Sequence, residues 1–151
     1  MLLPFRNRCK ILCLSLCTGS KKGLIMNTKN IPVSEYKNVR DLLERYVEAL
    51  RTGSVDMMSG IFHKDVVTHG IVDGELVGGT GNLAAEFVRI NGASTEITSH
   101  IDILDITPVT AVARIIIEND AIGSDCCEYV NLIKTDGKWS VFSKAFLQFD
   151  K

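Results

Sequence analysis

The chain has an amphipathic pattern between its thirty-fourth and fifty-third residues. Apolar side chains recur every three or four positions from Tyr36 to Leu50, which is the spacing of one buried face of a helix. Ser34 stands where a hydroxyl group can cap the start of such a helix, and Gly53 stands where a glycine can end it. We therefore predict one long amphipathic helix between Ser34 and Gly53.

Two shorter helices are also predicted. Ser54 can cap the second helix, whose apolar stripe continues to a predicted end near His63. A third apolar stripe with helical spacing begins at residue 83 and ends before Gly92. These helices are short, so packing against a larger surface must stabilise them.

A β-hairpin is predicted between the second and third helices. Residues 66–72 are rich in β-branched side chains, and Asp73-Gly74 is a dipeptide that favours a tight turn before residues 75–77. Glycines at positions 78, 79 and 81 predict a flexible connection to the third helix.

The second half of the chain consists of long β-type runs. Turn signals at Pro108, Gly123 and Asp136-Gly137 separate four of them. The runs cover residues 96–107, 110–119, 125–134 and 138–149. Four strands with short connections predict an antiparallel meander with helices over one face. The predicted class is α+β, with the order α-α-β-β-α-β-β-β-β.

Two of these strands carry apolar side chains on both faces. In residues 110–119, Ala111 and Ile115 lie on one face of the predicted strand, and Val112 and Ile116 lie on the other. The last strand has a similar pattern. An antiparallel sheet with one face in water is expected to carry polar side chains on that face, so apolar side chains on both faces need an explanation. We expect a homodimer through the open sheet face, which Ile115→Asp should dissociate. The alternative is a sheet curved enough to bury parts of both faces within one chain.

The first residues differ in composition from the rest. No acidic residue precedes Glu35, whereas six basic residues do. We assign residues 1–33 to an N-terminal extension outside the fold and residues 34–151 to one domain. The extension is either a targeting segment or an upstream stretch before a working start at Met26. Its apolar run, residues 11–17, is too short to cross a bilayer, so no membrane segment is expected.

Charge and cysteine content limit the function. A net charge of -1 provides no surplus of cations for phosphates, so nucleic acid is not an expected partner. Cys126 and Cys127 are neighbours that would point to opposite faces of a strand, so no disulfide is expected in the domain. Because the domain has no expected disulfide, a reducing compartment is favoured, and we expect a cytoplasmic location. The three histidines are scattered and no phosphate-binding loop is present, so no metal or cofactor is predicted.

Three strings resemble the nuclear-transport-factor-2-like superfamily. They are Glu-Arg-Tyr-Val-Glu-Ala-Leu-Arg-Thr-Gly at 44–53, Ile-Phe-His-Lys-Asp-Val at 61–66 and Asp-Gly-Lys-Trp at 136–139. The order of elements matches as well, and the similarity points to the SnoaL-like, ketosteroid isomerase-like and lumazine-binding branches. The resemblance implies a cone-shaped fold in which N-terminal helices pack in a strongly curved antiparallel sheet around a pocket.

The resemblance also implies candidate pocket residues. Tyr46 matches the tyrosine with which ketosteroid isomerases stabilise an oxyanion, although it could equally be a core residue with its hydroxyl bonded to backbone. The second oxyanion donor aligns near Glu128 and Tyr129, where a solvated glutamate is the simpler reading. The isomerase base falls at Gly70, which cannot take a proton. His69 could replace that base, or could point away from the pocket because neighbours on a strand alternate.

Two other features complete the set of candidates. Phe62, next to the predicted end of the second helix, is expected in the wall of the pocket. His100 and Asp102 share one strand face, where a carboxylate could orient an imidazole, although their polar neighbours favour solvent.

We expect a dimeric protein that binds a small, largely apolar molecule in its pocket. One alternative is a cofactor-free isomerase, cyclase or dehydratase for an apolar carbonyl compound, which would require Tyr46 and His69 to converge on one cavity. A second alternative is a non-catalytic protein-interaction module, which a collapsed cavity would favour.

Overall fold

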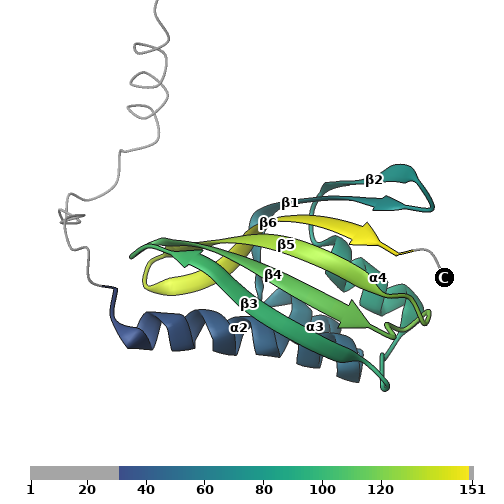
Figure 1. Ribbon diagram of the computed structural model, residues 1–151, viewed down its shortest axis with the longest axis horizontal. Helices are drawn as coiled ribbons and strands as arrows, with labels where there is room; N and C mark the ends of the chain where they lie inside the picture. The colour runs from purple at the N-terminus through teal and green to yellow at the C-terminus, as the bar shows by residue number, and fades with distance from the viewer. Residues whose placement is uncertain (1–30, 150–151) are drawn as a thin grey trace, which may run out of the picture.

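The computed structural model describes residues 31–149, which form three helices and a six-stranded sheet (Figure 1). Helix α2, Val33–Thr52, buries its apolar stripe and ends at Gly53, which has a left-handed backbone with φ of 69°. The helix begins one residue before Ser34, and the residue at its N-cap is Pro32, which makes no side-chain cap. Ser34 therefore lies in the first turn and is not the cap. The predicted extension lies outside the described residues except for its last three positions.

Helix α3, Val55–Ser59, is shorter than predicted. The Ser54 side chain accepts a hydrogen bond from the backbone N–H of Met57, so the predicted cap is confirmed. The helix ends at Ser59, and the first strand already begins at Phe62. His63 thus belongs to a strand and does not end the helix, because Gly60 and a tight turn separate the two elements.

The strands form one sheet in the order β2-β1-β6-β5-β4-β3. Their bounds are Phe62–Val72 for β1, Glu75–Thr80 for β2, Thr98–Ile106 for β3, Thr110–Glu118 for β4, Cys126–Thr135 for β5 and Lys138–Gln148 for β6. The predicted meander β3-β4-β5-β6 and the β1-β2 hairpin are confirmed. The sheet is mixed, however, because β1 and β6 pair in parallel and so join the hairpin to the meander.

The hairpin turn uses the predicted dipeptide. Asp73 and Gly74 have φ values of 51° and 78°, the left-handed pair that matches the twist of a two-residue hairpin. Gly78 and Gly79 are not a loop, since both lie within β2. Helix α4, Leu83–Asn91, follows, with Asn82 as its cap.

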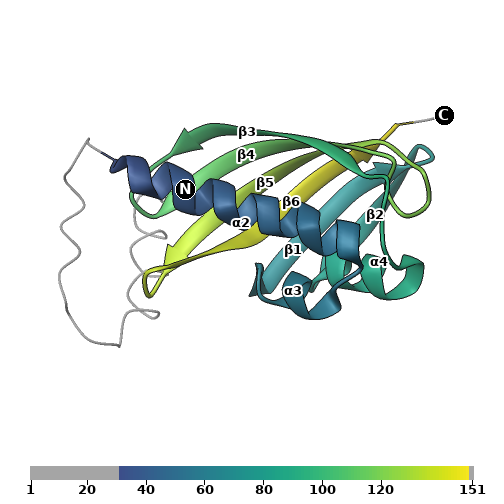
Figure 2. The same ribbon diagram turned by 90° about the horizontal axis from the view of Figure 1, so that it is seen from below.

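The sheet curves around helix α2, so that the helix lies in the hollow of the sheet and crosses its strands (Figure 2). One end of α2 is fastened to the β5-β6 hairpin. Glu35 accepts hydrogen bonds from the Lys134 ammonium group at 2.7 Å and from the Trp139 indole N–H at 2.8 Å. The Lys134 bond, with Trp139 second, lowers the pKa of Glu35. These contacts fix the helix across the concave face of the sheet.

A bulge in β6 changes which side chains face inward. The register between β5 and β6 shifts at Phe142, so Val141 and Lys144 both point to the concave side although three positions separate them. Regular alternation along the strand would place Ala145 on the same face as Val141, and the bulge reverses this. Ala145 and Leu147 lie on the outer face, while Lys144 and Phe146 lie inside.

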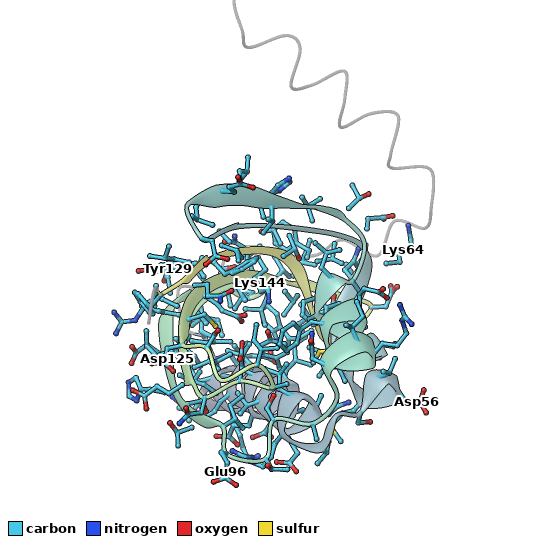
Figure 3. The ribbon with its side chains drawn as sticks, turned by 90° about the vertical axis from the view of Figure 1, so that its right-hand side faces the viewer. Asp56, Lys64, Glu96, Asp125, Tyr129 and Lys144 are labelled. Atoms are coloured by element: carbon cyan, nitrogen blue, oxygen red, sulfur yellow. The ribbon has the colours of Figure 1, made fainter. Side chains whose placement is uncertain are left out.

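The two faces of the sheet differ in burial. Ile115 lies on the inner face and is fully buried, so replacing it would damage the core and would not test a dimer. Val67, Ile71, Tyr129 and Leu147 are partly exposed on the outer face. Figure 3, which looks along the sheet from one end, shows Lys144 inside the curved sheet and Tyr129 outside it.

No helix among residues 31–149 is long and apolar enough to span a membrane.

Candidate functional site

A cavity of about 360 Å³ lies between the concave face of the sheet and the helices. Its wall is formed by β1, β2, β4, β5 and β6, by the C-terminal half of α2, by α4, and by the loop between β4 and β5. Most of the lining is apolar, and among the residues that line it only Asp120, Glu128 and Lys144 carry charge. The volume is in the range of about 300–1,000 Å³ that small-molecule sites occupy.

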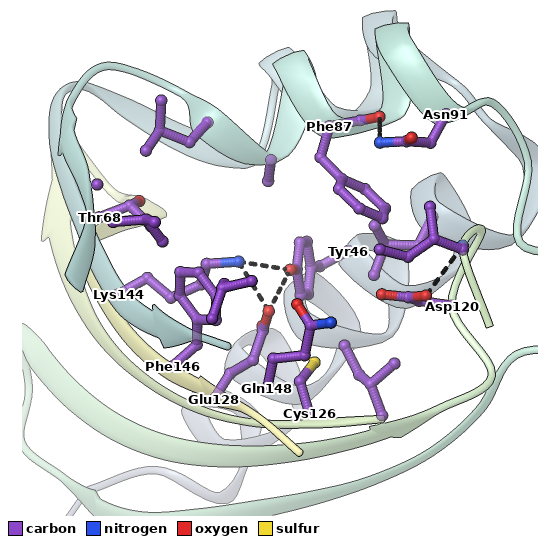
Figure 4. Close-up of a pocket in the computed structure, with 18 residues that line it drawn as sticks. Tyr46, Thr68, Phe87, Asn91, Asp120, Cys126, Glu128, Lys144, Phe146 and Gln148 are labelled. Carbon is purple, nitrogen blue, oxygen red and sulfur yellow. Dashed lines mark hydrogen bonds and ion pairs between the residues drawn. The ribbon is translucent and has the colours of Figure 1, made fainter. Parts of the chain in front are cut away.

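Three polar side chains meet on the wall of this cavity (Figure 4). The Lys144 ammonium group donates to Glu128 Oε1 at 2.7 Å and to the Tyr46 hydroxyl at 3.1 Å. The Tyr46 hydroxyl donates to the same Glu128 oxygen at 3.0 Å. All three side chains are buried, so a closed triangle of hydrogen bonds stands in largely apolar surroundings. We call these residues the polar triad.

Each member of the triad is held by a different element. Tyr46 projects from the buried stripe of α2 and packs edge-on against the ring of Phe62, with the ring centroids 5.6 Å apart. Glu128 stands on the inner face of β5. Lys144 reaches the inside because of the bulge at Phe142 in β6. The triad is thus assembled from a helix and two strands, all rigid elements, which favours a fixed geometry.

Burial sets the protonation of the tyrosine. Removal from water, together with the nearby Glu128 carboxylate, raises the pKa of Tyr46 well above its usual value of 10.0. The hydroxyl therefore keeps its proton at neutral pH and can act as a hydrogen-bond donor. Lys144 also lies over two aromatic rings, with its Nζ 5.5 Å from the ring centroid of Tyr46 and 5.2 Å from that of Phe146.

Two buried polar atoms on the cavity wall have no hydrogen-bond partner among the described residues. They are Glu128 Oε2 and Thr68 Oγ1. Unpaired buried acceptors and donors are unfavourable, so each is expected to find a partner that enters the cavity. Thr68 stands directly beside Lys144 in the parallel pairing of β1 with β6.

The β4-β5 loop closes one side of the cavity. Asp120 Oδ1 accepts the backbone N–H groups of Ile122 and Ser124, which holds the loop in a tight turn. Gln148 donates to the Ser124 hydroxyl at 2.9 Å and ties the loop to β6. Cys126 lines the cavity beside the loop, and burial raises the pKa of its thiol from 9.0 to about 12. This thiol remains protonated and is a poor nucleophile.

Tyr46 and Glu128, two of the candidate residues, line the cavity. The hydroxyl of Tyr46 is bonded to side chains and not to backbone. Glu128 is 3% exposed, so its interpretation as a solvated strand residue is wrong. Phe62 supports Tyr46 from the core and does not line the cavity.

His69 and Tyr129 lie on the outer face of the sheet, away from the cavity. The reason is strand alternation, because each is next to an inward-facing residue, Thr68 and Glu128 respectively. Tyr46 and His69 therefore do not converge, and the enzyme hypothesis in that form is wrong.

Gly70 and Lys144 are two further residues on the inner face of the sheet that affect the possible chemistry of the cavity. Gly70 faces inward, and the ring of Phe146 fills the space beside it. Lys144 was missed by the sequence analysis. It stands between apolar residues of β6, such as Val141 and Phe146, but regular alternation from Val141 would have turned it outward.

The His100–Asp102 pair exists on the outer surface. His100 Nε2 is 2.9 Å from Asp102 Oδ1, and the Arg114 guanidinium donates to Asp102 Oδ2 at 2.7 Å. The Arg114 bond, with His100 contributing, lowers the pKa of Asp102. None of these side chains lines the cavity, and together they form a partly exposed charge cluster.

Comparison with known proteins identifies the family of this chain. The family model described as "Putative lumazine-binding" matches residues 34–147. Aldolase FrzH of a Cladobotryum species is 32% identical over 123 residues, which make up 82% of this chain and 98% of the aldolase.

Two solved structures share the fold. An NTF2-like protein of unknown function from Methylobacillus flagellatus is 27% identical with a TM-score of 0.74, over 80% of this chain and 97% of that one. One from Shewanella baltica is 26% identical with a TM-score of 0.74, over 82% of this chain and 100% of that one. The chain therefore belongs to the nuclear-transport-factor-2-like superfamily, in the family described as putative lumazine-binding.

Proposed function

We propose that the cavity binds a small, largely apolar carbonyl compound and catalyses aldol chemistry at the carbon next to the carbonyl group. The observation that carries this proposal is the buried triad of Tyr46, Glu128 and Lys144 on the wall of an apolar cavity. Aldol chemistry needs a base for a C–H proton and donors for the oxygen that becomes negative. The triad contains both.

The roles follow from the hydrogen-bond pattern. The Tyr46 hydroxyl and the Lys144 ammonium group are donors that can turn toward a substrate oxygen. Both are shielded from water, and hydrogen-bond donors stabilise a negative oxygen more strongly when water is excluded. Glu128 Oε2 has no partner among the described residues, so it is the oxygen available to take a proton. Acid, base and donor then lie within one hydrogen-bonded group.

The apolar walls indicate the chemical class of the substrate. The lining is rich in aliphatic and aromatic side chains, including Leu50, Val72, Leu83, Phe87, Ile117 and Phe146. Such walls favour hydrocarbon groups over sugars or phosphates. The name of the relative, an aldolase, supports the reaction class, and its match covers almost the whole of that protein.

A thermal-shift screen tests this proposal. The panel contains apolar ketones and aldehydes, their alcohol analogues, and pterins as competitors suggested by the family name. We expect the carbonyl compounds to raise the melting temperature, because ligands of the folded state stabilise it. Tyr46→Phe should weaken the shift, whereas Tyr36→Phe, at a surface position on the same helix, should not. A shift produced by pterins alone would contradict the proposal.

We also propose that two copies of the chain associate through the outer face of the sheet. Ile71, Leu147 and Cys127 form one row across β1, β6 and β5, and His69, Ala145 and Tyr129 form the next. We call these residues the outer patch. Tyr129 and Leu147 are 47% and 43% exposed, which is unusual for neighbouring large side chains on a monomer. A two-fold dimer would bury the same patch on both copies.

A further inference from the structure

We infer that the Lys144 amine forms a covalent imine with the carbonyl carbon of the substrate. The inference rests on the proposed function and extends it, because donors alone would activate a carbonyl group without any bond to the protein. Lysine amines in apolar pockets are suited to this chemistry. A covalent route would make ketones and aldehydes the substrate class, since esters and amides do not form imines in this way.

The position of the nitrogen permits the attack. Lys144 lines the cavity, and two of its three N–H bonds point to Glu128 Oε1 and the Tyr46 hydroxyl. The third has no acceptor among the described residues, and the nitrogen lies 5.2 Å from the ring centroid of Phe146. One side of the nitrogen therefore borders the apolar space where a carbonyl carbon can approach. Figure 4 shows this nitrogen between Thr68 and Tyr46.

Glu128 provides the proton acceptor that the attack needs. An ammonium group is not a nucleophile, so a proton must first leave Lys144, and Glu128 Oε1 is 2.7 Å away. The transfer converts a buried ion pair into a neutral amine and a neutral acid. No net charge enters or leaves the cavity in this transfer, because the two buried charges disappear together.

Formation of the imine balances without any further reagent. The amine lone pair forms the C–N bond while the carbonyl π electrons move to oxygen, which takes one proton through Tyr46. The resulting carbinolamine receives the second proton from Glu128 and loses its oxygen as water, leaving a protonated imine. The two protons lost by nitrogen thus leave in that water. Removal of a neighbouring C–H proton by Glu128 then gives the enamine. Its carbon attacks the carbon of a second carbonyl group, whose π electrons move to oxygen, and that oxygen takes the proton held by Glu128. Water then hydrolyses the protonated imine, which releases the product and restores the Lys144 ammonium group.

The two unpartnered atoms fit the intermediate. A carbinolamine carries a hydroxyl group next to the lysine nitrogen, and this hydroxyl needs both a donor and an acceptor when it is buried. Thr68 Oγ1 stands on the strand beside Lys144, and Glu128 Oε2 belongs to its ion-pair partner. Both side chains are more than nine-tenths buried and line the cavity.

Acetylacetone tests the inference directly in the full-length protein. This diketone reacts with an imine-forming lysine to give a stable enaminone and water, which an ultraviolet band and intact-protein mass spectrometry detect. We expect one adduct per chain, mapped to the peptide that contains Lys144. Lys144→Arg keeps the positive charge and should form no adduct. The matched control is Lys134→Arg, because Lys134 also pairs with a glutamate at 2.7 Å but lies outside the cavity.

A second readout separates the imine from the proposed function. Ketones found in the thermal-shift screen are incubated with the protein in H₂¹⁸O, since imine formation and hydrolysis exchange the carbonyl oxygen. Binding without adduct or oxygen exchange, or an adduct mapped to another lysine, would overturn the imine and leave the proposed function standing. Absence of ketone binding would overturn both. If Lys144→Arg does not fold, as judged by circular dichroism, the mapped position in the wild-type chain decides.

Discussion

The backbone of Gly70 lies directly against the ring of Phe146. A Cβ atom at position 70 would be 2.3 Å from Cδ1 of that ring, which is much closer than real contacts allow. The resemblance to ketosteroid isomerases puts their base at this position, which is closed to any side chain while Phe146 keeps its place. The ring instead forms part of the cavity wall beside Lys144.

This contact predicts how Gly70→Ala behaves. The methyl group must displace Phe146, so we expect a loss of about 1–3 kcal/mol of unfolding free energy, measured by urea titration. The double variant Gly70→Ala/Phe146→Ala should lose less than the sum of the two single variants, because the space is then free. Gly60→Ala is the control, since its nearest neighbour would be 3.6 Å away. Additive losses would show that the two residues do not compete for space.

The buried ion pair predicts a double-mutant result. Lys144→Met leaves Glu128 buried without its counter-charge, and we expect a loss of about 3–5 kcal/mol of unfolding free energy. Lys144→Met/Glu128→Leu should be more stable than either single variant, because no uncompensated charge remains. As a control, Lys37→Met breaks an exposed pair with Asp41 and should change stability far less. A double variant less stable than both singles would contradict this electrostatic account.

Alkaline pH should destabilise the fold through Cys126 and Tyr46. The folded-state pKa of Cys126 is about 12, against 9.0 for the free thiol, and that of Tyr46 is also raised. Between these values the folded chain binds more protons than the unfolded chain, so stability falls as pH rises from about 9 to about 12. Cys126→Ala should flatten this slope in denaturant titrations at each pH. Cys127→Ala, on the outer face, should keep the wild-type slope.

The outer patch predicts the oligomeric state. We expect a dimer by sedimentation at low micromolar concentration, and a monomer for Leu147→Asp, because a buried carboxylate on each copy would be opposed by its symmetry mate. Ile90→Asp changes an apolar residue on α4 that is more exposed, at 66% against 43% for Leu147, and should remain dimeric. If the wild-type chain sediments as a monomer, the proposed dimer is wrong.

Most of the fold was predictable because its signals are local. The helical period of α2, the helical stripe from Leu83 to Gly92 and the Asp73-Gly74 turn depend on neighbouring residues, and all three are confirmed. The parallel pairing of β1 with β6 joins segments about half a chain apart and leaves no comparable local pattern. For that reason the mixed character of the sheet became visible only in the structure.

The candidate site was predictable only in part. Tyr46 and Glu128 were found through the resemblance, since their positions are fixed by a helix and by regular alternation in β5. Lys144 was not, because a bulge at Phe142 reverses the alternation that a sequence pattern assumes. His69 was selected for its chemistry, whereas its neighbour Thr68 is the residue that faces the cavity.

The most direct test of the account is hydrogen–deuterium exchange at the carbon next to the carbonyl group. A ketone that stabilises the protein is incubated with it in D₂O, and proton nuclear magnetic resonance follows the loss of the signal. We expect exchange well above the buffer rate with the wild-type chain, and a fall of roughly 10²–10⁴-fold with Glu128→Gln, which removes the base. Wild-type exchange no faster than in buffer, or full exchange with Glu128→Gln, would contradict the proposed chemistry.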